Sequence, residues 1–402
     1  MSTGMRNSHI MIIGAGIGGL AAALALQRRG FRVTVYERAR EIREVGAGVI
    51  ITANARRALR DLGVDAALEA ASNTISVFHT CHYATGEVLR AVPNEAIRQK
   101  VGLASLGVHR GDLHGLLLQA VLQNDATCLH ANHVFVSLEQ DEAGVTARFA
   151  NGSSARADVL VGADGNVSAV RSFLFPQEAP KFAGQVAFRS LIPVALVPPS
   201  LLQRVSVMSA GPGRYLLSYP LRDGSIMNLV GLVQSDTWAA EGWSIPASNA
   251  EFAQAYAGYE PDLLTLIGNI PPDNLFKWGL RDREPLATWS VGRVTMLGDA
   301  AHPMTPFLGQ GACMALEDAL LLGRAFEASP SMAEALTRYE AARRPRGSSA
   351  RRRTPRYRDR AACSRPPSAC RWCPRRRGCA RSSPSARRTC RKGSWRADPA
   401  WS

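Results

Sequence analysis

The chain has 402 residues, 46% hydrophobic and 20% charged, which is typical of a folded protein large enough for two domains. Its net charge of +15 would suit a nucleic-acid-binding protein, but residues 343–402 hold 20 of the 48 Lys and Arg residues and two of the 33 acidic ones. The remaining residues therefore carry a net charge of −3, which argues against a basic nucleic-acid-binding surface in the main body.

The N-terminal segment "HIMIIGAGIGGLAAALALQRRGFRVTVYER" predicts a strand, a glycine turn, a helix and a second strand. Its uncharged run, residues 10–26, is short for a membrane span, and several glycines interrupt it. No cleavage signature and no other span is visible, and only three cysteines precede the C-terminal tail. We therefore expect a cytoplasmic protein without a membrane anchor.

The glycine turn follows the GxGxxG pattern through Gly14, Gly16 and Gly19. Such glycines permit a tight turn, close approach of a pyrophosphate and packing of helix on strand. Glu37 ends the second strand, where a carboxylate can accept hydrogen bonds from both hydroxyls of a ribose. The pattern alone also occurs in ordinary turns, but this context predicts a dinucleotide site and leaves NAD and FAD open.

Two later stretches repeat the arrangement of a buried strand that ends on an aspartate. "ADVLVGADGNVSAVR" contains Asp164, and "GRVTMLGDAAHPMTPFLGQGACMALEDALLLGRAF" contains Asp299, with a helix expected from about Gly311. Ligands bind outside the carboxyl ends of parallel strands, so Asp299 is expected to face a ligand. Either stretch alone could be a turn. The glycine loop and these two stretches, in this order, predict one long ligand that is bound at both ends.

With these three motifs, residues 8–345 resemble the class A flavoprotein monooxygenases, such as the p-hydroxybenzoate and salicylate hydroxylases. The resemblance implies an α/β fold, with a Rossmann-type FAD-binding domain and an inserted, mostly antiparallel β-sheet substrate domain. It also implies FAD as cofactor and NAD(P)H as co-substrate. No metal is expected.

The resemblance also assigns the cofactor contacts. Gly14, Gly16, Gly19 and Glu37 would hold the ADP half of FAD, with Arg38 and Gly48 near the adenosine and ribityl chain. Arg110 would reach the FAD backbone, Val134 would flank the adenine, and Asp164 belongs to a motif associated with both FAD and NAD(P)H. Asp299 would bind the ribityl hydroxyls, and the residues beside the isoalloxazine would be Gly309, Gln310, Gly311 and Ala312.

The domains are expected to interleave along the chain. The FAD domain would comprise residues 1–75, 100–178 and 275–345, and the substrate domain residues 76–99 and 179–274. Alternating apolar residues in "QVAFRSLIPV", "RVSVMS", "RYLLSYPL" and "SIMNLVGLV" predict strands in the latter. The oligomeric state is left open between monomer and homodimer.

Four residues are candidates for the substrate side. Tyr215 and Tyr219 are four apart, so on a strand they face the same side, either towards substrate or in sheet packing. Related hydroxylases often carry His at the first position, so Tyr215 is a departure that weakens its assignment as a proton acceptor. Arg189 could pair with a substrate carboxylate or face solvent, and Pro306 could offer its backbone carbonyl.

The function implied is hydroxylation of a small phenol or N-heteroaromatic compound, using NAD(P)H and O₂, with Tyr219 as the best candidate to assist substrate deprotonation. A flavin-dependent epoxidase and a urate-type hydroxylase remain alternatives within the fold. The non-enzymatic alternative is a truncated scaffold that binds FAD but is inactive.

Residues 346–402 have a separate character. The tail contains no Leu, Ile, Val, Met or Phe, so it cannot bury enough apolar area to fold and is expected to be disordered. Its five cysteines lack the two CxxC pairs of a zinc site. The abundance of Arg, Ser, Pro, Cys and Trp is typical of a shifted reading frame in a GC-rich gene. A nucleic-acid-binding arm and a disulfide module are the alternatives.

Removal of residues 348–402 is therefore expected to leave the melting temperature nearly unchanged, because the segment has no apolar core to lose. Differential scanning calorimetry of the full and shortened chains measures this. Loss of the cooperative transition on truncation would contradict it. Salt-sensitive DNA binding by the full chain alone would favour the arm.

Overall fold

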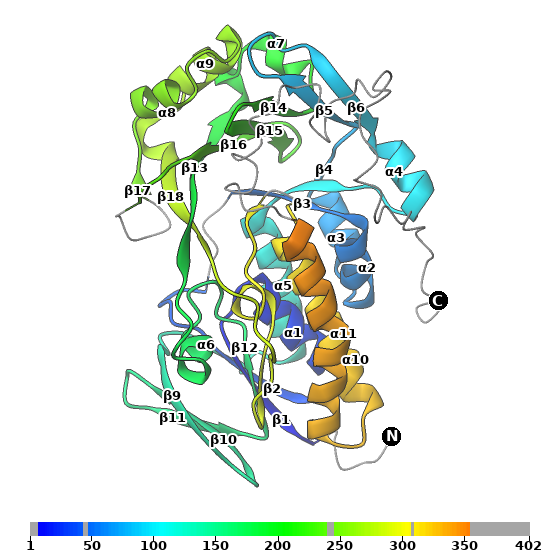
Figure 1. Ribbon diagram of the computed structural model, residues 1–402. Helices are drawn as coiled ribbons and strands as arrows, with labels where there is room; N and C mark the ends of the chain where they lie inside the picture. The colour runs from blue at the N-terminus through cyan, green and yellow to red at the C-terminus, as the bar shows by residue number, and fades with distance from the viewer. Residues whose placement is uncertain (1–6, 43–46, 239–244, 307–308, 354–402) are drawn as a thin grey trace, which may run out of the picture. The chain divides into compact units, whose positions relative to one another are not determined.

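The computed structural model describes residues 7–42, 47–238, 245–306 and 309–353. Their strands form four sheets, with five, eight, three and three strands (Figure 1). Most of the expected C-terminal tail, from residue 354 onwards, lies outside the described residues.

The five-stranded sheet is entirely parallel, with the strand order β19, β12, β1, β2, β8. In that order its strands are Val294–Met296, Val159–Gly162, His9–Ile13, Arg32–Tyr36 and Leu129–His130. Residues of β1, β12 and β19 are almost wholly buried, as parallel strands covered on both faces require. Helices α1 (Ile17–Gln27), α5 (Arg110–Asn124), α10 (Gly311–Ala328) and α11 (Met332–Arg353) belong to this layer, with α10 packed between α1 and α11 (Figure 1).

The three sequence motifs meet at one edge of this sheet. Ile13 at the end of β1 pairs with Gly162 of β12, which pairs with Met296 of β19. Because the strands are parallel, the loops that follow all emerge on the same side. Segments about 280 residues apart therefore lie side by side, as one long ligand requires.

The eight-stranded sheet has the order β17, β18, β13, β16, β15, β14, β5, β6, and only β14 and β5 are parallel neighbours. In that order the strands are Ile245–Pro246, Leu275–Asp282, Lys181–Pro193, Ile226–Gln234, Arg214–Leu221, Ser206–Gly211, Val77–His82 and Val88–Pro93. Helices α7 (Pro199–Leu202), α8 (Asn249–Ala255) and α9 (Pro261–Gly268) accompany it. The expected inserted, mostly antiparallel sheet is confirmed.

One strand crosses a predicted boundary. Leu275–Asp282 was expected in the FAD domain, but it is β18 and pairs with β13 inside the eight-stranded sheet. Its partner strand is about 90 residues earlier in the chain, so local sequence does not reveal the pairing. The rest of the predicted domain division stays a prediction.

The smaller elements complete the fold. One sheet orders β3 (Gly48–Ile51), β7 (Leu106–His109) and β4 (Asn73–Thr74), and the other β11 (Ser154–Ala157), β10 (Gly144–Phe149) and β9 (Phe135–Asp141). The remaining α-helices are α2 (Ala53–Asp61), α3 (Asp65–Ala70), α4 (Asn94–Val101) and α6 (Ala169–Leu174). Single 3₁₀ turns lie at Val194–Leu196, Pro272–Asn274 and Gly298–Ala300.

The predicted start of the disordered tail, residue 346, was wrong, because α11 continues to Arg353. Arg346 forms an ion pair with Glu317 of α10. Gly347 lies so close to Trp289 that a Cβ would be 3.1 Å from the indole. Contacts with α10 and Trp289, invisible in the local composition, therefore hold the first residues of this segment in the folded body.

Candidate cofactor and substrate site

The first glycine loop joins β1 to α1. Gly14 has a φ of +106°, and a Cβ there would lie 2.6 Å from the carbonyl oxygen of Ala163, so only glycine fits. At Gly16 no protein atom lies within 4 Å of the position that a Cβ would take. Gly16 is also the N-cap of α1 and makes no side-chain cap hydrogen bond. No side chain therefore caps the first N–H groups of α1, and the space beside Gly16 is open, so the loop fits the diphosphate of FAD.

Glu37 follows β2 and fixes this loop. Its Oε2 accepts the N–H of Ala15 at 2.8 Å, and its Oε1 accepts the N–H of Ala39 at 2.9 Å. The backbone carbonyl of Glu37 accepts the N–H of His133, which places the exposed Val134 at the same end of the sheet. The exposed Arg38 is also there. The structure therefore brings together the three residues predicted for the adenosine end.

Glu37→Ala is expected to weaken FAD binding by about 1–3 kcal/mol, because it removes charge-assisted hydrogen bonds at the adenosine end and frees the Ala15 N–H. Fluorescence titration of the apoprotein with FAD measures the loss. Glu139→Ala, at an exposed ion pair with Arg148, is the control. Equal FAD affinity for both variants would contradict the assignment.

Asp164 follows β12 and caps α6. Its carboxylate accepts from the Ser168 hydroxyl at 2.5 Å and from the backbone N–H groups of Ala169 and Val170 at 2.7 and 3.1 Å. This capping fixes the second motif beside Gly14. A direct contact of Asp164 with FAD or NAD(P)H stays a prediction.

Asp299 lies after β19, as predicted. Its side chain is accessible to solvent, yet it lies among many protein atoms, and this desolvation raises its pKa. The charges of His302 and Arg110 act in the other direction and lower that pKa. Exposure combined with desolvation is expected at the floor of a concave site. Oδ1 would lie 3.8 Å from a Cβ on Gly311, the first residue of α10. Asp299, Arg110 and the α10 N-terminus thus come together from three distant segments.

The loop before α10 contains further predicted residues. Pro306 is exposed, and its carbonyl oxygen accepts a hydrogen bond from the N–H of Gly309. A carbonyl oxygen has two lone pairs, so it can still accept one hydrogen bond from a ligand. The Gln310 side chain hydrogen-bonds to Asn54 and Thr52, which fixes it against α2. Gly309 and the partly exposed Gly311 and Ala312 leave their backbone open to a flat ligand.

A buried charge network supports this loop from behind. Asp318 of α10 accepts from Gly298 N–H at 2.9 Å, contacts His302 Nε2 at 2.5 Å and pairs with Arg343 Nε at 2.6 Å. Burial favours neutral forms of both partners, but their mutual attraction outweighs it: the pKa of Asp318 is lowered and that of His302 is raised. His302 therefore has a structural role, and the network holds the Asp299 turn on α10.

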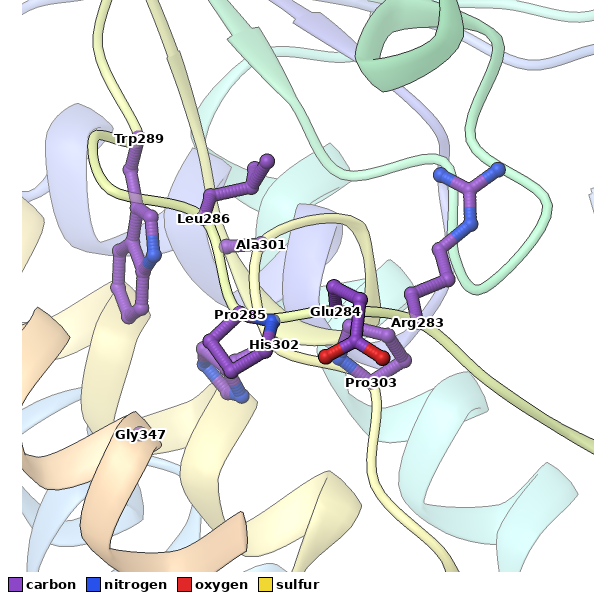
Figure 2. A pocket seen from close by; sticks show the side chains of 9 residues that line it. All are labelled: Arg283, Glu284, Pro285, Leu286, Trp289, Ala301, His302, Pro303 and Gly347. Carbon is purple, nitrogen blue, oxygen red and sulfur yellow. The ribbon is translucent and has the colours of Figure 1, made fainter. Parts of the chain in front are cut away.

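A small pocket lies beside His302 (Figure 2). Trp289, whose ring centre is 5.0 Å from that of His302, forms one side, and Gly347 of α11 lies next to both. Its volume of about 10 Å³ is that of a single water molecule. None of the residues predicted to contact substrate lines this pocket.

The eight-stranded sheet carries three of the four residues predicted to contact substrate, namely Arg189, Tyr215 and Tyr219. In register, Arg189 of β13 lies opposite Val230, which lies opposite Leu217 of β15. Leu217 stands midway between Tyr215 and Tyr219, so alternation places Arg189 and both tyrosines on one face. The observed strand β15 confirms the prediction that the two tyrosines lie on the same side.

The two faces of this sheet have different neighbours. Phe188, next to Arg189, points the other way and stacks on Phe252 of α8 at 4.7 Å between ring centres. Arg189 instead lies over the indole of Trp278, with 5.2 Å between its guanidinium carbon and the ring centre. Tyr219 contacts Gly48 on the same side as Arg189. Arg189 and Tyr219 therefore share the sheet face that packs against Gly48.

Both tyrosines are neutral at physiological pH. Tyr219 is only 2% exposed, Tyr215 is partly buried, and burial raises the pKa of both hydroxyls well above the usual tyrosine value. Neither is poised to act as a phenolate base. Each can donate or relay a hydrogen bond.

Several residues of the site were not predicted. Asn228 and Trp278 lie on the same sheet face as Arg189 and Tyr219, and Asp318 and Arg343 hold the Asp299 turn. A polar residue within an apolar alternation, as in "SIMNLVGLV", and an acid within an apolar helix, as in "CMALEDALLLG", were the available signals.

The described ranges also bear on metal binding, disulfide formation and membrane insertion. No cluster of His, Cys, Asp and Glu there could hold a metal ion. The three cysteines Cys81, Cys128 and Cys313 are buried and free. Nor does any helix in this part of the chain have the length and apolar character needed to cross a bilayer.

Comparisons with known proteins agree with this geometry. The family model for the FAD binding domain matches residues 7–354. The chain is 36% identical to 3-amino-4-hydroxybenzoate 2-monooxygenase of Streptomyces platensis, over 86% of both chains. It is 38% identical to 3-hydroxybenzoate 6-hydroxylase of Polaromonas naphthalenivorans, over 81% of this chain and 80% of the relative. The structure of Klebsiella pneumoniae HpxO with FAD and uric acid matches with a TM-score of 0.78 and 28% identity, over 87% of both chains.

Proposed function

Because the chain belongs to the FAD binding domain family and is a class A flavoprotein aromatic hydroxylase, we propose that its substrate is a small hydroxylated aromatic carboxylate. Bound FAD, reduced by NAD(P)H, would activate O₂ in such reactions, with one oxygen atom entering the ring and the other leaving as water. The protein's own contribution is to bind the ring, orient it and exclude water. Two curated relatives named for hydroxybenzoate substrates support this class.

Arg189 carries the proposal. A guanidinium pairs with a carboxylate through two parallel hydrogen bonds, which fixes the orientation of the ring as well as its position. Trp278 beneath Arg189 holds the guanidinium plane, and the apolar row of Val230 and Leu217 provides a surface for a ring. In this arrangement Tyr219 donates or relays a hydrogen bond to the ring hydroxyl, and Tyr215 flanks it.

The residue roles on the cofactor side form part of the same proposal. The first glycine loop with Glu37 and Arg38 holds the ADP half, and Gly48, Arg110 and Asp299 hold the ribityl chain. Backbone groups of the turn before α10 would lie beside the isoalloxazine. The N-terminus of that helix would stabilise negative charge on the reduced ring.

Arg189→Gln is expected to raise KM for a hydroxybenzoate roughly 10–100-fold with a smaller change in kcat, because a hydrogen bond between charged groups contributes about 1.5–3 kcal/mol. A phenol without a carboxylate should show no such change. Steady-state NAD(P)H oxidation with matched substrate pairs measures both values. Arg148→Gln, at an exposed ion pair, is the control. An equal loss for both substrates would overturn the carboxylate assignment.

A planar anionic N-heterocycle such as urate is the second candidate. The match to the HpxO structure with uric acid favours it, since a guanidinium can also pair with a heterocyclic anion. Stimulation of product formation by urate, and by no hydroxybenzoate, would select this alternative.

A further inference from the structure

Gly48, the first residue of β3, is pressed against the eight-stranded sheet. Its backbone N–H donates to Oδ1 of Asn228 at 2.7 Å. A Cβ on Gly48 would lie 2.7 Å from the Asn228 side chain and 2.7 Å from the Tyr219 hydroxyl. Such a close approach leaves no room for a side chain, so the contact fixes the backbone of β3 against one pair of residues.

Asn228 is an unusual residue for its place. It lies in β16, an interior strand of the sheet, directly opposite Tyr219, and its exposed fraction is 0%. The Gly48 N–H is a donor, so the amide oxygen must face it and the orientation of the amide is set. Its Nδ2 then has no hydrogen-bond partner among the described residues. A buried donor without a partner is costly, so packing alone does not account for an asparagine here.

The contact joins the substrate-binding face to the cofactor segment. Gly48 pairs with His109 of β7, and the carbonyl of Ala47 accepts the N–H of Arg110. Arg110 in turn lies close enough to Asp299 to influence its titration. A displacement of Gly48 would therefore also disturb Arg110 and Asp299, which are both predicted to contact FAD.

We propose that Asn228 is a positioning residue that holds the Gly48 segment in its FAD-binding conformation through the Oδ1 contact. The inference rests on FAD as cofactor and not on the identity of the substrate. Replacement of the amide should thus impair FAD binding without impairing folding, whereas a merely structural asparagine would do the reverse.

The test is FAD titration of the apoprotein by fluorescence, together with the melting temperature of the same apoprotein. Asn228→Leu, which keeps the side-chain shape but removes the acceptor, should raise the Kd for FAD at least tenfold with the melting temperature retained. Asn228→Asp keeps a carboxyl oxygen as acceptor opposite the Gly48 N–H, whether that carboxyl is ionised or neutral, and should bind FAD within about threefold of the wild type.

Ser190→Ala is the matched control. Ser190 is buried in the neighbouring strand β13 and also has an unpartnered hydroxyl, but it points to the opposite face. It should leave the Kd for FAD unchanged. Wild-type affinity in Asn228→Leu, or equal weakening in Asn228→Leu and Asn228→Asp, would overturn the proposal. So would a loss of affinity explained by a matching fall in melting temperature. All readouts use FAD alone, so a wrong substrate class would not affect them.

Discussion

Asp318→Asn is expected to lower the free energy of unfolding by about 3–5 kcal/mol, because removing one member of a buried charge network leaves its partners buried and uncompensated. Asp318 is 0% exposed and is the shared partner of His302, Arg343 and the Gly298 N–H. Loss of its charge should also release the Asp299 turn. Urea denaturation of the apoprotein measures the first effect, and FAD affinity measures the second.

Glu327→Gln is the matched control for this variant. It lies on the same helix, but its ion pair with Arg29 is partly exposed and should contribute no more than about 1 kcal/mol. Equal destabilisation by the two variants would show that burial of the network does not matter.

The contribution of this network also depends on pH. The lowered pKa of Asp318 gives stability that is present above the ordinary aspartate pKa and is lost as pH falls through the lowered value. The raised pKa of His302 gives stability that is present below the ordinary imidazole pKa and is lost as pH rises through the raised value. The difference between wild type and Asp318→Asn should therefore be largest at mildly acidic pH and smaller in alkali.

Tyr219→Phe is expected to lower turnover roughly 10²-fold with FAD still bound, in the range for losing a proton-transfer partner. The hydroxyl is buried, neutral and in contact with the Gly48 segment. Phenylalanine fills nearly the same space, so packing should be preserved. Only the hydroxyl that is proposed to donate or relay a hydrogen bond to the substrate should be lost. Product formation under saturating NAD(P)H and substrate measures the effect, with the flavin absorbance recorded in parallel.

Tyr259→Phe provides the comparison for Tyr219. Its hydroxyl donates to the Arg214 carbonyl and it packs with the helices on the opposite face of the sheet. Turnover should change little in that variant. If Tyr219→Phe also turns over at the wild-type rate, Tyr219 takes no part in the proton relay and its role reduces to packing.

The cofactor loops could be predicted from sequence because each is local. A buried strand, a glycine pattern and a following helix lie within about 20 residues, so short-range rules locate Gly14, Glu37 and Asp299. Strand alternation likewise placed Tyr215 and Tyr219 on one side, without knowledge of the partner strands.

The remaining features depend on distant pairing. Asn228 matters through Gly48, 180 residues earlier, and Asp318 through Arg343 on the next helix. The strand β18 and the C-terminal part of α11 likewise take their places from tertiary contacts. The composition therefore placed the start of the tail at residue 346, whereas the helix α11 continues to Arg353.

The proposed reaction inserts one oxygen atom into an aromatic carboxylate. Purified protein with FAD and NAD(P)H should be supplied with isotope-labelled O₂ and, in turn, salicylate, the hydroxybenzoates, hydroxynicotinates and urate, and product mass should be recorded. We predict that at least one aromatic carboxylate accelerates NAD(P)H oxidation and gains one labelled oxygen atom. Labelled product from urate alone, hydrogen peroxide as the sole product with every compound, or no acceleration by any of them would overturn the proposal.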